Sequence, residues 1–136
     1  MSGEIQSNDY KPGVCNIGQR ELSVRKKFLN IFLPATVLLS AASFFLDSSL
    51  ILWILLLIST FCMIVLYLEL KFKFCIIFGF FSLYNFEKLG TIHEVKNQAH
   101  QSSDRKRVLE IVIQSFLFSL IYATSLHLIA GYLNVH

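Results

Sequence analysis

The stretch LILWILLLISTFCMIVLYLEL, from Leu50 to Leu70, decides the fold class of this chain. A helix over its 21 mostly apolar residues is long enough to cross the ~30 Å hydrocarbon core of a bilayer. Trp53 near its start and Tyr67 near its end match the aromatic residues that gather at the two membrane interfaces. The stretch therefore predicts a transmembrane helix over residues 50–70.

Two further apolar runs lie on either side of this stretch. Residues 28–46 (FLNIFLPATVLLSAASFFL) would form a helix of roughly 28 Å, and residues 108–132 form a third run of sufficient length. Only residues 47–49 separate the first run from the second, so we expect an antiparallel helical hairpin. The chain is predicted to be a single all-α membrane domain, residues 1–136, with three transmembrane helices.

The composition supports the membrane class. Hydrophobic residues make up 54% of the 136 residues and charged residues only 15%, whereas soluble domains average about 25% charged residues. Basic residues flank the apolar runs and form no stripe with interleaved aromatic residues, which is typical of membrane topology and not of nucleic-acid binding. The lipid bilayer is the expected partner, and nucleic acid is not expected as one.

A shorter apolar segment, residues 74–86, is ambiguous. Its 13 residues are too few to span as a helix, so a re-entrant or interfacial element on the cytoplasmic side is expected. If this segment does not cross, every basic residue falls on one face of the membrane. The positive-inside tendency then places residues 1–27 and the polar loop 87–107 in the cytoplasm and the C-terminus outside.

Two cysteines, Cys15 and Cys75, are predicted to lie near the same cytoplasmic interface. A pair of thiols placed in this way can form a redox pair or relay sulfur. The alternative is that both are buried apolar residues in a reducing compartment, since no Cys-x-x-Cys spacing occurs. Asn16, beside the first cysteine, is expected to cap the helix that begins near Gln19.

The last apolar run carries a stripe of hydroxyl side chains at helical spacing, Ser115, Ser119 and Tyr122, with Gln114 beside it. Small and hydroxyl residues on one helix face allow close approach and hydrogen bonding between membrane helices. The stripe is equally compatible with packing inside the chain and with docking onto a partner subunit. Ser102 or Ser103 is expected to cap this last helix.

Enzymatic constellations are absent from the sequence. The transmembrane runs hold no paired carboxylates, no glycine-rich phosphate loop is present, and no serine sits in a nucleophile-elbow setting. His93 and His100 lie in the polar loop without enough accompanying ligands for a metal site. We therefore expect no metal and no cofactor, and non-enzymatic function is favoured over an enzymatic one.

The segments PGVCNIG (residues 12–18) and FCIIFGFFSLYNF (residues 74–86) carry a resemblance. They are similar to a group of uncharacterised small prokaryotic integral membrane proteins with a PGVCNIG start, and more distantly to the two-helix inner-membrane domain associated with rhodanese sulfurtransferases. The resemblance implies a prokaryotic cytoplasmic membrane and, through the rhodanese link, sulfur handling. The chain departs from the second family because Ile76 replaces a proline after the cysteine, residues 82–85 contain no second cysteine, and a third span is present.

Two functional hypotheses follow. The first is a non-enzymatic accessory or assembly subunit of a larger membrane complex, bound to another membrane protein. The second is a thiol-based redox or sulfur-relay protein that uses Cys15 and Cys75. A homo-oligomeric pore is a weaker third idea, since three spans are too few to enclose a pore within one chain.

Overall fold

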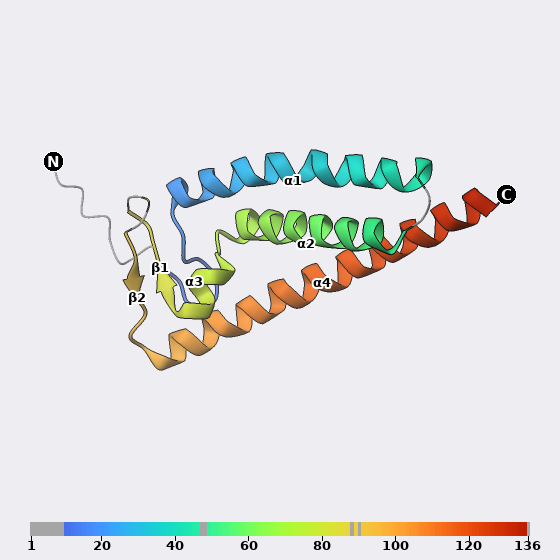
Figure 1. Cartoon of the computed structure of the whole chain (residues 1–136). Helices are drawn as coiled ribbons and strands as arrows, with labels where there is room; N and C mark the ends of the chain where they lie inside the picture. Colours follow the sequence, from blue (N-terminus) through green and yellow to red (C-terminus); the bar gives the residue numbers. More distant parts are fainter. Residues whose placement is uncertain (1–9, 47–48, 88, 90, 136) are drawn as a thin grey trace.

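The computed structural model describes residues 10–46, 49–87, 89 and 91–135, with side chains up to residue 133. It contains three long helices, α1 (Gln19–Phe45), α2 (Leu50–Phe72) and α4 (Gln98–Val135). A short helix, α3 (Ile76–Phe81), and two short strands, β1 (Leu83–Tyr84) and β2 (His93–Glu94), lie between α2 and α4. The long helices run side by side, with the short elements at one end and the C-terminus at the other (Figure 1).

The three long helices confirm the expectation of three apolar segments. Each is long and apolar enough to cross a bilayer, and together they are consistent with a multi-pass membrane protein. Their outer faces carry large apolar side chains, for example Leu38, Phe45 and Leu128. Such extensive apolar exposure suits a lipid environment and not water.

Helix α2 lies between the other two long helices and packs on both. Small polar side chains join the helices where they approach: the Thr36 and Ser59 hydroxyls are 2.8 Å apart, between α1 and α2. The Ser40 hydroxyl lies 2.9 Å from the Tyr122 hydroxyl, between α1 and α4. Hydrogen bonds between small residues are a usual means of holding membrane helices together, because apolar burial gives little advantage over lipid.

The end of the bundle that holds the short elements is called the junction here. It comprises residues 10–18, the start of α1, the end of α2, residues 73–87, 89 and 91–97, and the start of α4. Lys73, with φ of 52°, ends α2 and turns the chain back. Helix α3 has six residues, so it is far too short to span a membrane.

The junction contains a small antiparallel sheet that the all-α expectation missed. Strands β1 and β2 pair Leu83 with Glu94 and Tyr84 with His93. A parallel bridge between Ile17 and Asn85 ties residues 10–18 to the same sheet region. The strands have two residues each, which is too short for alternation of polar and apolar residues to be visible in the sequence.

Two long helices begin earlier than their apolar runs. Helix α1 starts at Gln19, nine residues before the run 28–46, and α4 starts at Gln98 inside the expected loop 87–107. The predicted caps at Ser102 or Ser103 are wrong, because the Asn97 side chain accepts a hydrogen bond from the Ala99 amide at 2.9 Å. The start of α1 agrees with the helix start expected near Gln19. The start of α4 was missed because its polar first turns pack on the junction, which an apolar-run criterion does not detect.

Candidate functional site

Residues 10–18 are held against the start of α4 by Asp104. This side chain is fully buried and accepts a hydrogen bond from the Tyr10 hydroxyl at 2.7 Å and from the Gly13 amide at 2.7 Å. Gly13 has φ of +65° and lies against the Ser103 carbonyl, so a Cβ there would be strained and 3.1 Å from that oxygen. The tight turn at Gly13 is therefore what brings its amide to Asp104.

Aromatic stacking reinforces this attachment. The Tyr10 ring stacks on Tyr84 with centroids 5.0 Å apart, and Tyr84 stacks on His93 at 5.4 Å. Burial, followed by the hydrogen bond to the Asp104 carboxylate, raises the pKa of Tyr10 well above its ordinary value. His93 and His100, the two histidines noted in the sequence, thus border an aromatic cluster, since His100 lies 6.2 Å from the Tyr10 ring.

Asn16 links residues 10–18 to the turn after α2. Its side-chain oxygen accepts a hydrogen bond from the Cys75 amide at 2.7 Å, and its side-chain nitrogen donates to the Cys75 carbonyl at 3.0 Å. Its backbone amide donates to the Lys73 carbonyl at 3.2 Å. The prediction that Asn16 caps α1 is wrong: the cap position is Gly18, and no side chain caps that helix.

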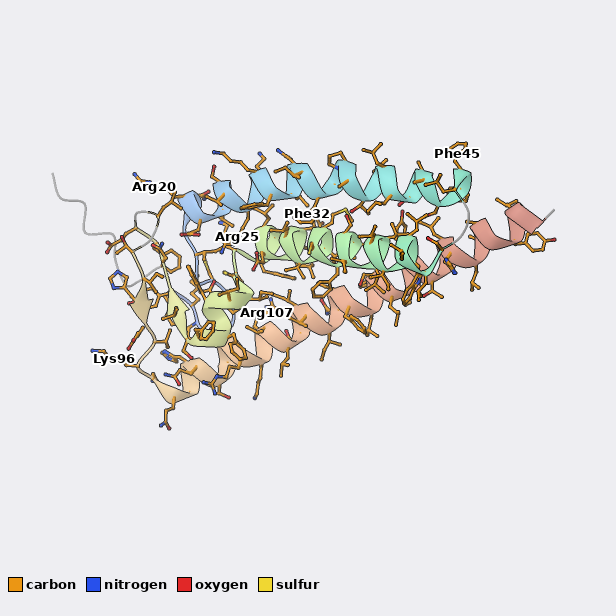
Figure 2. All side chains as sticks on the ribbon, in the orientation of Figure 1. Arg20, Arg25, Phe32, Phe45, Lys96 and Arg107 are labelled. Carbon is orange, nitrogen blue, oxygen red and sulfur yellow. The ribbon has the colours of Figure 1, made fainter. Side chains whose placement is uncertain are left out.

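A buried ionic cluster joins α1 to α2. Arg25 lies between these helices (Figure 2), where its guanidinium is 2.8 Å from the Glu21 carboxylate and 3.2 Å from the Glu69 carboxylate. Glu69 also accepts a hydrogen bond from the Ile76 amide at 2.9 Å, and Glu21 accepts one from the Asn85 side chain at 3.1 Å. One connected set of polar groups therefore fixes α1, α2, α3 and the end of β1.

The structure brings both cysteine residues of the candidate pair to the junction, but gives them different surroundings. Cys75 is buried, packs with Ile17 and Leu22, and has a thiol within reach of Arg25 and Glu69. Burial raises the pKa of this thiol. Cys15 is half-buried, and its thiol points toward the Ile17 carbonyl at 3.8 Å. Neither thiol is part of a disulfide among the described residues, and their predicted reaction with each other stays a prediction.

A cavity of about 810 Å³, called the basic hollow here, opens beside Cys15. Four cationic side chains and one carboxylate line it: Lys11, Arg20, Lys71, Lys73 and Glu87. In Figure 2, Arg20 lies at the outer start of α1, in contrast to Arg25 between the helices. The hollow lies at the ends of two apolar helices, so it places several charged side chains next to the lipid-facing part of the chain.

A second cavity, called the groove here, runs between the long helices and has a volume of about 470 Å³. Helix α2 forms its floor, with Thr36 of α1 on one wall and Gln114, Phe118 and Tyr122 of α4 on the other. The groove is mostly apolar. Gln114 is exposed, and its side-chain amide forms no hydrogen bond with another described residue.

The side chains of the hydroxyl stripe on α4 are either buried within the chain or bonded to another of its helices. Ser115 and Ser119 are fully buried, and the Ser119 hydroxyl donates to the Phe116 carbonyl at 2.9 Å. Tyr122 bonds Ser40 of α1, as described above. Docking of a partner subunit on the same stripe is not tested by these contacts and stays a prediction.

Within the described ranges, no group of three or more His, Cys, Asp or Glu side chains is arranged to hold a metal ion. Comparisons of the chain with protein-family models, curated proteins and solved structures found no match. Architecture and site geometry are therefore the basis for assigning a function to this multi-pass membrane protein.

The buried cluster around Arg25 is the main feature that sequence reasoning missed. Glu69 is the one acidic residue within the run 50–70, and an ionisable residue in a membrane helix signals a functional or structural partner. That signal points to Glu69, but it does not select Arg25 from the neighbouring Lys26 and Lys27.

Proposed function

We propose that this chain is a non-enzymatic accessory or assembly subunit that binds a transmembrane helix of another membrane protein in the groove. The observation that carries the proposal is the exposed side-chain amide of Gln114, which lines a mostly apolar groove between the long apolar helices.

Gln114 lies seven residues after Arg107, which corresponds to about 10 Å further along α4 and into the apolar part of the helix. Lipid tails offer no hydrogen bonds, so an amide facing them is unfavourable unless another helix supplies a partner. Two other polar side chains of the groove bond within the chain: the Thr60 hydroxyl donates to the Leu56 carbonyl at 2.7 Å, and Tyr122 bonds Ser40. The Gln114 amide is thus a polar group that a partner helix in the groove would satisfy.

The charged groups at the junction favour a structural role over a catalytic one. Glu21, Arg25, Glu69 and Asp104 are bound to one another, to backbone amides or to buried side chains. Groups committed in this way hold the fold and are not free to exchange protons with a substrate.

The alternative, a thiol-based redox or sulfur-relay protein, is favoured by one observation. Asn16, next to Cys15, forms two hydrogen bonds with the backbone of Cys75, so the segments that carry the two cysteines are bonded to each other. The raised pKa of Cys75 lowers its thiolate fraction at neutral pH and makes it a poor nucleophile. The subunit function is therefore the better supported of the two.

The orientation and the location are part of the same proposal. The basic residues of the described chain gather at the junction end, which the positive-inside tendency assigns to the cytoplasm. The C-terminus then lies outside the cell. The membrane is proposed to be a prokaryotic cytoplasmic membrane, as the sequence resemblance implies.

The test is site-specific photo-crosslinking in the native membrane. A benzophenone amino acid at Phe118, inside the groove, is expected to give a stoichiometric protein adduct, whereas the same probe at Leu117, outside the groove, is not. The adduct should be lost in Gln114→Leu and retained in Gln114→Asn, which keeps the amide. Lipid adducts at both positions, or a protein adduct indifferent to Gln114→Leu, would reject the partner-helix proposal.

A further inference from the structure

The basic hollow differs from the buried ionic cluster in one respect: its cations have no acidic partners among the described residues. None of the four, Lys11, Arg20, Lys71 and Lys73, forms an ion pair with any residue that the structure describes. The carboxylate on the same wall, Glu87, lies 3.5 Å from His93. We propose that the basic hollow binds the phosphate headgroup of an anionic phospholipid, independently of the partner helix proposed for the groove.

The position of the hollow favours a lipid over a soluble anion. Lys71 lies one helical turn after Tyr67, the aromatic residue at the end of the apolar run, so its ammonium group is at headgroup level. The other wall is formed by Gln19 and Arg20 at the start of α1, the antiparallel neighbour. Cations at this level attract anionic headgroups, and the concave arrangement brings several of them to one phosphate.

The walls also offer apolar contacts that a free phosphate ion would not use. Val14, Leu22 and Phe86 line the hollow together with the four cations. The volume of about 810 Å³ lies within the range of pockets that hold drug-sized ligands, and it exceeds what a lone phosphate requires. A glycerophosphate headgroup with the first carbons of its acyl chains matches both the charge and the apolar lining.

The test compares two pairs of lysines on the purified full chain. Lys71→Gln/Lys73→Gln removes two charges from the hollow, and Lys26→Gln/Lys27→Gln removes two exposed charges from α1 that do not line it. Binding of phosphatidylglycerol and phosphatidylcholine is measured by native mass spectrometry in neutral detergent. The first variant should bind phosphatidylglycerol roughly 30-fold more weakly than the wild type, and the second at most about threefold more weakly.

Cys15 provides a second readout, because it lines the hollow and is half-buried. In a Cys62→Ser background, the rate at which neutral N-ethylmaleimide alkylates Cys15 is compared in nanodiscs of the two lipids. Relative to phosphatidylcholine, phosphatidylglycerol should slow the alkylation of Cys15 about fivefold or more in the Cys62→Ser protein. It should leave the rate unchanged when Lys71→Gln/Lys73→Gln is added to that background. Circular dichroism of each variant verifies that the helices are retained.

Three results would overturn the proposal. Equal losses from the two lysine pairs would show diffuse surface attraction and no defined site. Absence of preference for phosphatidylglycerol over phosphatidylcholine would show that the headgroup charge is not recognised. Inorganic phosphate that protects Cys15 in detergent as well as phosphatidylglycerol does would show that the hollow binds a soluble anion. The crosslinking test of the groove is unaffected by each of these results.

Discussion

The substitution Arg25→Met tests whether the buried ion pairs hold the junction together. The Arg25 side chain is 12% exposed and the Glu69 side chain 7%, so the change leaves two carboxylates at the junction without their cation. Removing one partner of a buried ion pair destabilises a protein by about 3–5 kcal/mol, mostly because the remaining charge is uncompensated. For a chain of this size we expect a Tm lower by roughly 10 °C or more.

The assay is thermal unfolding in detergent in a Cys15→Ser/Cys62→Ser background, followed by a dye that becomes fluorescent on reaction with a thiol. Cys75 is buried in the folded protein and becomes reactive when the junction opens. Lys26→Met is the matched control, because Lys26 is an exposed neighbour on the same helix. It should change the stability by less than about 0.5 kcal/mol.

A charge-free variant separates the two possible roles of the ionic cluster. In Arg25→Met/Glu21→Gln/Glu69→Gln all three charges are removed, and much of the stability lost in Arg25→Met should return. A Tm for Arg25→Met within about 2 °C of the wild type would refute the reasoning, because it would show that water or local rearrangement compensates the carboxylates without cost.

Three more predictions concern single groups at the junction. Because the pKa of Tyr10 is raised in the folded protein, its contribution to stability is fully present below about pH 10, the ordinary pKa of a tyrosine, and is lost as the pH rises further. The Tm measured from pH 8 to 11 should therefore fall more steeply in the wild type than in Tyr10→Phe. Cys75, as the single remaining cysteine, should be alkylated at least about 100-fold more slowly in the folded protein than in denaturant, and equal rates would contradict its burial. Gly79→Ala places a Cβ 2.6 Å from the Phe74 ring and should destabilise by about 1–3 kcal/mol in thermal unfolding, whereas Gly131→Ala, with open space around it, should be neutral or stabilising.

The long helices could be read from the sequence because length and apolarity alone determine whether a segment can cross a bilayer. The run 50–70 and helix α2, Leu50–Phe72, differ by only two residues. The early start of α4 could not be read in this way. Residues 98–107 are polar, and their helix is stabilised by contacts with the junction and by the cap at Asn97, which resembles any other polar residue of that loop.

The candidate site was predictable only in part. Cys15 and Cys75 were expected near one interface, and both lie at the junction. The attachment of residues 10–18 to the turn after α2 depends on Asn16. Its side-chain amide bonds both the backbone amide and the backbone carbonyl of Cys75, which is 59 positions away. A short polar side chain before a helix is most often a cap, so local propensity gave the wrong partner for Asn16. Long-range hydrogen bonds of this kind carry no periodic signal in a sequence.

The hydrogen bonds of Asp104 also have a consequence for the order in which the chain is made. Tyr10 and Gly13 leave the ribosome more than ninety residues before the carboxylate that binds them, and Arg25 precedes Glu69 by 44. During synthesis, the first helix is therefore made with Arg25 paired to Glu21 alone and with its leading segment unattached. The junction closes only when the start of the last helix has been translated, so a chain interrupted before that point leaves the Tyr10 hydroxyl and the Gly13 amide without the carboxylate that binds them.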